Sequence, residues 1–169
     1  MKIFITSVAG FLCSHLAKRM LDLGHDVIGN DNLIGGDLIN LDKRISFFNV
    51  DCNNLEEMTR ITNGCEIIYH CAATAHEGLS VFSPNIITNN IFQASVSVIT
   101  AAIKKKARRF VYCSSMARYG NQTPPFKEEM NPQPADPYGI AKVAGENVLK
   151  VLADLNGMEW NIAVPHNII

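Results

Sequence analysis

The stretch that most restricts the fold is residues 2–24, where a short apolar run, a turn and a helical pattern follow one another without interruption. The run KIFIT, residues 2–6, has the continuous apolar character of a parallel strand that is covered on both faces. From Phe11 onward, apolar residues recur every three or four positions, and Gly24 supplies a typical helix end. The sequence therefore predicts a strand, a tight turn through Gly10 and a helix, in that order.

A helix that begins directly after a strand suits an anionic ligand such as a pyrophosphate, because its free backbone N–H groups and the positive end of its dipole point above the sheet. An ordinary buried strand and helix without a ligand gives the same pattern. This stretch alone therefore leaves both interpretations open.

A second strand is predicted over residues 25–29, and it leads into Asp31, which lies 21 residues after Gly10. Dinucleotide-binding folds place an acid at about this separation, where it accepts hydrogen bonds from the adenosine ribose hydroxyls. An aspartate also repels a 2′-phosphate, which favours NAD over NADP. Asp-Asn before a Gly-Gly pair is equally a common turn composition, but the separation from Gly10 favours the binding interpretation.

The rest of the chain alternates between strand and helix patterns. Strands are predicted over residues 44–50, 65–71, 108–113 and 160–164, helices over residues 55–62, 84–106 and 136–156, and a proline-rich loop over residues 121–137. This alternation predicts an α/β fold with a doubly wound parallel sheet of about six strands. The length fits a single domain over residues 1–169.

Composition argues against several classes of function. Charged residues make up 18% of the chain and the net charge is −1, so no basic surplus points to nucleic acid. The longest apolar runs have the length of strands, and we expect no membrane association and no signal peptide. Five cysteines lie far apart without metal-ligand spacing, which is typical of reduced thiols in the cytoplasm. No acid or cysteine is grouped with His70 and His76, so we expect no metal site.

The segment TSVAGFLCSH, which includes the predicted turn, resembles the TGGAGFIGSH opening of the NAD-dependent epimerase/dehydratase family, the extended short-chain dehydrogenases. That family spaces three glycines three residues apart, and Ser7, Gly10 and Cys13 occupy those positions here. The first glycine makes the turn, the second lets the backbone approach the pyrophosphate, and the third lets the helix pack on the strand. We expect Ser7 to make the turn with a negative φ, and Cys13 to place a sulfur between helix and sheet, which weakens cofactor affinity.

The resemblance implies further contacts to NAD along the chain. Asp51 and Cys52 match residues that flank the adenine, and Ala72 and Ala73 match small residues beside the central ribose and the phosphates. The complete set of NAD-contacting residues implied in this way is Ser7, Gly10, Phe11, Leu12, Asp31, Asn32, Asp51, Cys52, Ala72, Ala73, Tyr138, Lys142 and Pro165.

Two positions of the family pattern match less well. The family has an asparagine near the start of the long helix, and counting back from the end of that helix places it on Ile91, one residue after Asn90, so no role is assigned there. The segment PHN after Val164 resembles the family's R-P-x-N with the arginine replaced. It implies that Asn167 contacts the diphosphate of the substrate.

The most informative segments follow the fifth predicted strand. SSMARYG, residues 114–120, resembles the family's S-S-x-x-x-Y-G and implies that Ser115 hydrogen-bonds a substrate hydroxyl. YGIAK, residues 138–142, matches the family's Y-x-x-x-K, and a tyrosine and a lysine four residues apart share one helix face. That pair alone is weak, because any long helix can carry it on a solvated face. Together with a serine at a neighbouring strand end, it favours a catalytic site at the carboxyl edge of the sheet.

The residue types explain how such a site works. A free tyrosine has a pKa of about 10, so it is a base at neutral pH only where a positive charge favours the phenolate. Both Lys142 and an oxidised nicotinamide supply that charge. We therefore expect Tyr138 to take the proton of a sugar hydroxyl, Ser115 to orient that hydroxyl and Lys142 to hold the nicotinamide ribose.

The residues after Ser115 distinguish between reactions of the family. Its 4,6-dehydratases carry Asp-Glu directly after the catalytic serine or threonine, whereas Met116 and Ala117 stand here, so elimination lacks its acid and base. We expect a nucleotide-sugar 4-epimerase that uses NAD. A catalytically inactive NAD-binding fragment or interaction module, and a keto-sugar reductase, remain alternatives.

The resemblance covers nearly the whole chain but only the first half of the family's architecture. It implies a Rossmann-type domain without the C-terminal substrate domain, with a nucleotide sugar as its partner. A homodimer is compatible with it.

Overall fold

A parallel sheet of six strands forms the centre of the protein in the computed structural model, which describes residues 1–75 and 77–168. The strand order is β3-β2-β1-β4-β5-β6, and every neighbouring pair is parallel. The predicted doubly wound sheet is thereby confirmed. The strands are β1 (Lys2–Thr6), β2 (Asp26–Asp31), β3 (Ser46–Asn49), β4 (Ile67–His70), β5 (Arg109–Cys113) and β6 (Glu159–Ala163).

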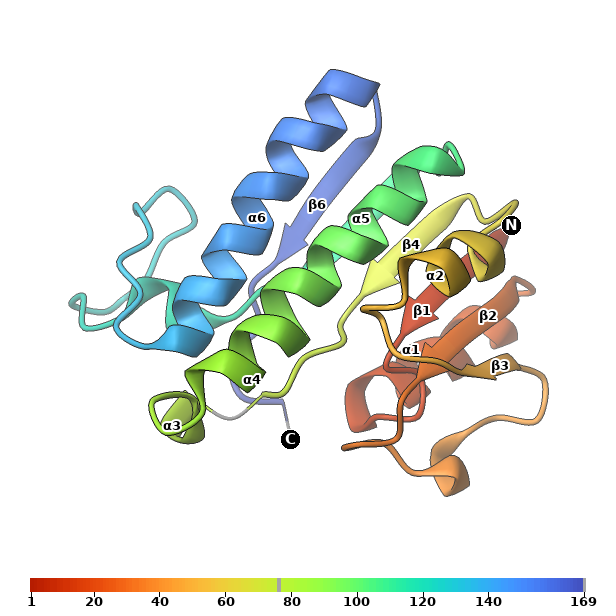
Figure 1. The fold of residues 1–169 in the computed structure, drawn as a ribbon, viewed down its shortest axis with the longest axis horizontal. Coiled ribbons are helices and arrows are strands. Elements are labelled where there is room, and N and C mark those ends of the chain that lie inside the picture. Colours follow the sequence, from red (N-terminus) through yellow and green to blue (C-terminus); the bar gives the residue numbers. More distant parts are fainter. Residues whose placement is uncertain (76, 169) are drawn as a thin grey trace.

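Helices cover both faces of this sheet. Figure 1 shows α2, α5 and α6 in front of the strands and α1 behind them. The helical elements are α1 (Phe11–Asp22), the 3-10 turn η1 (Leu38–Asn40), α2 (Leu55–Ile61), α3 (Glu77–Ser80), α4 (Pro84–Thr88), the π-helical segment η2 (Asn89–Gln93), α5 (Ala94–Lys104), the 3-10 turn η3 (Met116–Tyr119) and α6 (Pro137–Asn156).

Each face of the sheet has its own apolar core, because alternate residues of a strand point to opposite faces. On β1, Phe4 joins the core under α2, α5 and α6, whereas Ile3 and Ile5 join the core under α1. All three side chains are buried. Because both faces of β1 are buried, every position of its apolar run contributes to one core or the other.

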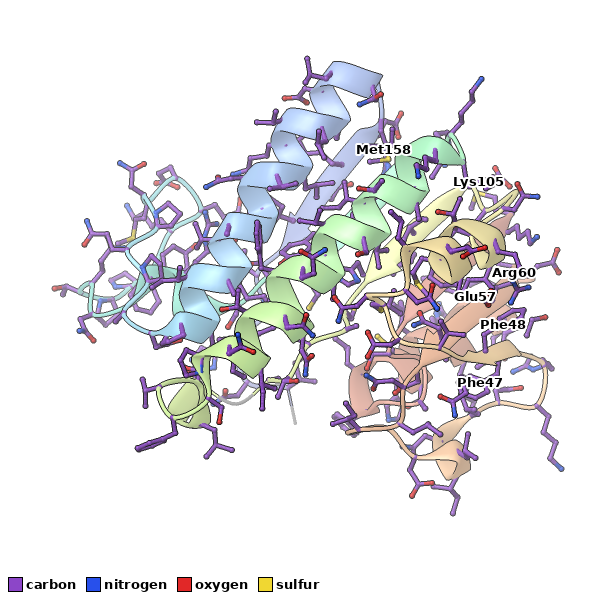
Figure 2. The ribbon with its side chains drawn as sticks, viewed as in Figure 1. Phe47, Phe48, Glu57, Arg60, Lys105 and Met158 are labelled. Carbon is purple, nitrogen blue, oxygen red and sulfur yellow. The ribbon has the colours of Figure 1, made fainter. Side chains whose placement is uncertain are left out.

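Different side-chain contacts stabilise the two edge strands, β3 and β6. The guanidinium of Arg60 on α2 lies 5.3 Å from the centre of the Phe48 ring on β3, and it forms an ion pair with Glu57 at 2.6 Å (Figure 2). Arg109 and Glu159 form an ion pair of 2.6 Å between β5 and β6. Strand β6 pairs only with β5, so its outer edge has no strand beside it within the described residues.

Strand ends differ from the predictions where other groups take the backbone hydrogen bonds. β4 is shorter than the strand predicted over residues 65–71, because the N–H of Cys65 donates to the Thr62 carbonyl and that of Cys71 donates to the Thr6 hydroxyl. β2 runs two residues further than predicted, since its last two residues pair with β3.

The helix predicted over residues 84–106 is a continuous helical run with a π-helical segment inside it, and it ends at Lys104. By length and composition alone, Pro84–Lys104 is apolar enough to cross a membrane, a feature that was not predicted from the sequence. Half of its most apolar window is buried in the fold, and α5 packs against α2 and α6. This burial is typical of a core helix.

Candidate active site

The loop between β1 and α1 turns at Ser7, whose φ is 57°. The expectation of a negative φ is wrong, because the turn keeps the left-handed geometry of a glycine even though a serine occupies it. Such a conformation costs a non-glycine residue on the order of 1 kcal/mol. Gly10 closes the turn: its N–H donates to the Ser7 carbonyl at 2.9 Å, and a Cβ at Gly10 would lie 3.1 Å from that oxygen.

Cys13 lies in the first turn of α1 and is buried between the helix and the sheet, as predicted. It packs in the same core as Ile3 and Ile5. Gly10 is the N-cap of α1, and no side chain caps the helix start. The first N–H groups of the helix are therefore available to an anion above the sheet.

Asp31 ends β2 with its carboxylate turned toward the β1–α1 loop. One oxygen accepts a hydrogen bond from the Ala9 N–H at 3.1 Å, and the other accepts one from the Leu33 N–H at 2.8 Å. Close by, the Asn32 amide donates to the Asp51 carboxylate at 2.7 Å. The predicted acid is thus fixed by backbone donors at the end of its strand.

A cavity of about 170 Å³, which we call the β2 cavity, opens beside Asp31. Asn30 and Asn53 line it, and within the described residues each has a buried side-chain oxygen without a hydrogen-bond partner. Such acceptors fit a ligand that carries amino or hydroxyl donors. The predicted cofactor residues that line this cavity are Ser7, Asp31, Asn32, Asp51, Cys52, Ala72 and Ala73.

Asn90 also lines the β2 cavity, and its role was not predicted from the sequence. Its amide donates to the Thr74 hydroxyl at 3.0 Å. Counting back from the end of the helix placed the family's asparagine on Ile91, whereas η2 is π-helical and accommodates an extra residue in its turn. The π-helical segment lies at the position of this one-residue offset.

A second cavity, of about 540 Å³, lies at the carboxyl edge of the sheet; we call it the Tyr138 cavity. Ser7 and Ala73 line both cavities, so the two adjoin. The structure thus brings every residue predicted for a site into one of two neighbouring cavities. Those that line the Tyr138 cavity are Ser7, Gly10, Phe11, Leu12, Ala73, Ser115, Tyr138, Lys142, Pro165 and Asn167.

Ser115 is held in place by the chain on both sides of it. The N–H groups of residues 114 and 116 donate to the carbonyls of Ala163 and Pro165 at 2.8 and 3.2 Å. The Ser115 hydroxyl accepts a hydrogen bond from the Ala117 N–H at 3.1 Å and so caps η3. Its position therefore depends on strand β6 and the residues that follow that strand.

The start of α6 packs closely on η3 and brings Tyr138 beside the serine. Asp136 is the N-cap, and its carboxylate accepts a hydrogen bond from the Gly139 N–H at 2.8 Å. A Cβ at Gly139 would lie 2.8 Å from the Ala117 carbonyl oxygen, so only glycine allows this approach. The approach sets Tyr138 and Ser115 in the same cavity.

Lys142 follows one turn later and is almost fully buried. Its Nζ donates to the Cys113 carbonyl at 2.7 Å and lies 5.9 Å from the centre of the Tyr138 ring. Burial lowers the pKa of Lys142. Burial also raises the pKa of Tyr138, and a hydrogen bond with Ser115 opposes that shift. The phenol is therefore protonated at neutral pH, with one cation and one hydroxyl placed where they favour its ionised form.

A buried ion pair lies behind these residues and was not predicted from the sequence. Glu146 on α6 is fully buried, accepts a hydrogen bond from the Ser114 hydroxyl and pairs with Arg118 at 3.3 Å. It thereby links α6 to the segment that carries Ser115. The available signal was a glutamate one helical turn after Lys142, on the same face of the helix.

His70, the last residue of β4, forms a buried link between the end of β1 and the start of α5. Its Nδ1 and Nε2 lie 3.0 Å from the hydroxyls of Thr6 and Ser95. Because the Ser95 hydroxyl donates to the Ile91 carbonyl at 2.6 Å, Nε2 carries the proton and Nδ1 accepts from Thr6. Burial, and then the charge of Lys142, lowers the pKa of His70 to about 3. His70 is thus neutral and structural.

Residues 1–75 and 77–168 contain no group of three or more His, Cys, Asp and Glu side chains that could hold a metal ion. His76 lies outside the described residues.

A family model described as the NAD dependent epimerase/dehydratase family matches residues 3–169. The chain belongs to this family. It is 29% identical over 163 residues to a putative UDP-glucose 4-epimerase of Methanocaldococcus jannaschii, a match that covers 95% of this chain and 53% of the relative.

Solved structures of the family superpose closely on this chain. A UDP-glucose 4-epimerase of Thermotoga maritima, solved with UDP-glucose, has a TM-score of 0.92 and 30% sequence identity, over 96% of this chain and 54% of that one. A UDP-glucose 4-epimerase of Thermus thermophilus, solved with NAD, has a TM-score of 0.90 and 27% identity over the same shares. The chain spans about half the length of these relatives.

The side chains of this family member fit NAD at several separate points. The β2 cavity presents acceptor oxygens to a ligand that is rich in hydroxyl and amino donors. They belong to the Asp31 carboxylate and to the amides of Asn30 and Asn53, whose Oδ1 atoms have no hydrogen-bond partner among the described residues. The uncapped start of α1 presents donors, which suit the pyrophosphate. The two cavities adjoin, as a ligand with two nucleoside ends requires.

Proposed function

We propose that this chain is the NAD-binding and catalytic part of a nucleotide-sugar 4-epimerase. The observation that best supports the proposal is the convergence of Ser115, Tyr138 and Lys142 on one cavity, which adjoins the β2 cavity. Open parallel sheets bind ligands at their carboxyl edge, where both cavities lie. Family membership adds the expectation of NAD.

The two cavities divide the proposed contacts to the cofactor. Asp31 would hold the adenosine ribose, the backbone around Gly10 would hold the pyrophosphate, and Lys142 would hold the nicotinamide ribose. Bound NAD supplies a hydride acceptor that takes the hydrogen of a sugar carbon and returns it. The Asp31 carboxylate disfavours the extra phosphate of NADP by charge repulsion.

Tyr138 is the proposed base, and the chain supports this role through its neighbours. Burial raises the pKa of Tyr138, so removing a proton from the phenol needs help from the Lys142 ammonium. Ser115 orients the sugar hydroxyl, whose proton passes to Tyr138 as the sugar is oxidised. The same proton returns to the sugar oxygen when the sugar is reduced on its other face.

The residues after Ser115 favour epimerisation over elimination. Met116 and Ala117 form the first part of η3 and carry no titratable side chain, so no acid and base pair stands there to remove water. Asn167 lines the Tyr138 cavity and is the proposed contact to the substrate diphosphate.

The decisive experiment incubates the purified chain with NAD and UDP-glucose and measures UDP-galactose by chromatography. Tyr138→Phe should lower turnover at least about 100-fold, because it removes the proton acceptor. NADH affinity, measured by fluorescence titration, should stay nearly unchanged. Tyr69→Phe, which removes a phenol outside both cavities, is the matched control. Unchanged turnover in Tyr138→Phe would rule out the proposed base.

A second candidate is a cofactor-binding chain without turnover. It is favoured by Ser7, which holds a strained turn where the family has glycine, and it predicts NADH binding with no conversion of UDP-glucose. A keto-sugar reductase would instead consume NADH in proportion to the keto sugar added. The same titration and chromatography separate these outcomes.

We further propose a cytoplasmic homodimer. All five cysteines are free thiols, which suits a reducing compartment. Ile86 on α4 and Ile140 on α6 are each 55% exposed, and the two helices pack together, so they offer an apolar surface to a second copy. Light scattering should give twice the chain mass for the wild type and a monomer for Ile140→Asp. A monomeric wild type at high concentration would exclude the dimer.

A further inference from the structure

Two cysteines face each other across neighbouring strands at the floor of the Tyr138 cavity. Cys71 follows β4 and Cys113 ends β5, and the residues directly before them, His70 and Tyr112, are register partners. Adjacent strands lie about 4.8 Å apart, which falls within the Cα separation that a disulfide spans. The backbone therefore places this pair at a bridgeable distance.

The direction of the two side chains agrees with this placement. The rings of His70 and Tyr112 lie together on the α5 side, with centres 5.8 Å apart. Because successive strand residues point to opposite faces, Cys71 and Cys113 both point to the α1 side. Cys71 packs there against the core that contains Cys13 of α1, and the Cys71 and Cys113 thiols each affect the pKa of the other, which agrees with two thiols side by side.

Access distinguishes these cysteines from Cys52 and Cys65, while Cys13 also lines the Tyr138 cavity but is buried. Cys71 and Cys113 are only half-buried, and both line the Tyr138 cavity. Cys52 and Cys65 are buried in the core on the opposite face. A small reagent that enters the Tyr138 cavity therefore reaches the first pair and not the second.

We propose that Cys71 and Cys113 are an oxidation site, which closes to an intrachain disulfide on exposure to a peroxide. In the first step the peroxide oxidises one thiol to a sulfenic acid and releases water. In the second step the other thiol attacks that sulfur, the S–S bond forms and a second water leaves. Two thiols thus give up two electrons and two protons, and hydrogen peroxide accepts both.

The surroundings also determine how fast this happens. Mutual contact and burial raise the pKa of the Cys113 thiol, and the nearby Lys142 charge only partly opposes that shift. Few thiolates are present at neutral pH, so the reaction is slow and accelerates as the pH rises. Bound NAD would cover the same cavity and slow the reaction further; this last expectation rests on the proposed function.

The test exposes the whole chain to hydrogen peroxide, blocks the remaining thiols with N-ethylmaleimide and maps the peptides by mass spectrometry. The expected result is a cross-link between the peptides of Cys71 and Cys113, lighter by two hydrogens and reversed by dithiothreitol. Cys71→Ser and Cys113→Ser should abolish it, and Cys13→Ser should retain it. A link between Cys13 and Cys71, or sulfinic acids without any link, would overturn the proposal.

A parallel series with saturating NADH separates this inference from the proposed function. Slower cross-linking supports both ideas. Cross-linking at an unchanged rate leaves the disulfide in place and counts against cofactor binding in the Tyr138 cavity.

Discussion

The buried ion pair between Glu146 and Arg118 gives the sharpest test of how the site is held together. Glu146→Leu introduces an apolar side chain of similar size, and it removes the acceptor of the Ser114 hydroxyl and the partner of the Arg118 guanidinium. Arg118 is 8% exposed, so its charge would remain in the interior without a counter-charge.

The magnitude follows from this burial. Removing one partner of a buried pair costs about 3–5 kcal/mol, because the other charge is left desolvated. Arg118 keeps a contact with the Tyr119 ring at 5.3 Å and is not completely buried, which favours the lower end of this range. We expect Glu146→Leu to lower the free energy of unfolding by about 3 kcal/mol.

Urea denaturation followed by circular dichroism measures this loss. A double-mutant cycle with Arg118→Leu separates the pair from its surroundings, and the double variant should be more stable than the sum of the single losses predicts. Glu57→Gln is the matched control, since Glu57 forms a shorter but solvent-exposed pair with Arg60, and its loss should have a much smaller effect. If Glu146→Leu costs no more than Glu57→Gln, the ion pair does not hold α6 to the Ser115 segment.

Three further predictions follow from single residues. The folded-state pKa of His70, about 3, lies below its ordinary value of 6.5. Between these two pH values the imidazole is protonated in the unfolded chain and neutral in the folded chain. The free energy of unfolding is therefore highest well above pH 6.5 and decreases as the pH falls toward 3, with a loss of about 2 kcal/mol at pH 5. Urea denaturation at a series of pH values should show this pH dependence in the wild type and not in His70→Gln. Ser7→Gly relieves the positive φ and should raise both the melting temperature and NADH affinity; a lower melting temperature would contradict the strain. Gly145→Ala should cost about 1–3 kcal/mol, because its Cβ would lie 2.3 Å from the Tyr112 hydroxyl, whereas Gly78→Ala meets open space and should cost nothing.

Much of the fold follows from local patterns in the sequence. Ile3, Phe4 and Ile5 predict a strand covered on both faces because the backbone alternation alone requires two cores. Asp136 and Gly157 mark the ends of α6 by their own capping chemistry, since one accepts an N–H of the first turn and the other adopts φ of 66°. Such features depend only on residues close in sequence.

The structure differs from the sequence prediction where contacts between residues far apart in the sequence determine the local structure. The N–H of Cys71 bonds to the Thr6 hydroxyl, a partner 65 residues away, so no local pattern reveals that β4 has already ended. Asn90 lines the β2 cavity from within the π-helical segment η2, and neither feature is indicated by counting back along the sequence from the end of the helix. Glu146 gains its importance from Arg118 and Ser114, which reach it through the packing of α6 on η3.

The position of Ser115 has a dynamic consequence. The backbone bonds on either side of the serine end on the carbonyls of Ala163 and Pro165, and β6 itself is paired along one edge only in the described part of the chain. Edge strands unfold locally more readily than central strands. Because β6 and the residues after it hold Ser115, local unfolding of β6 also releases the serine. A molecule that pairs with the free edge of β6 would slow amide hydrogen exchange in that strand. It would also restrict the positions that the Ser115 hydroxyl can take relative to a sugar.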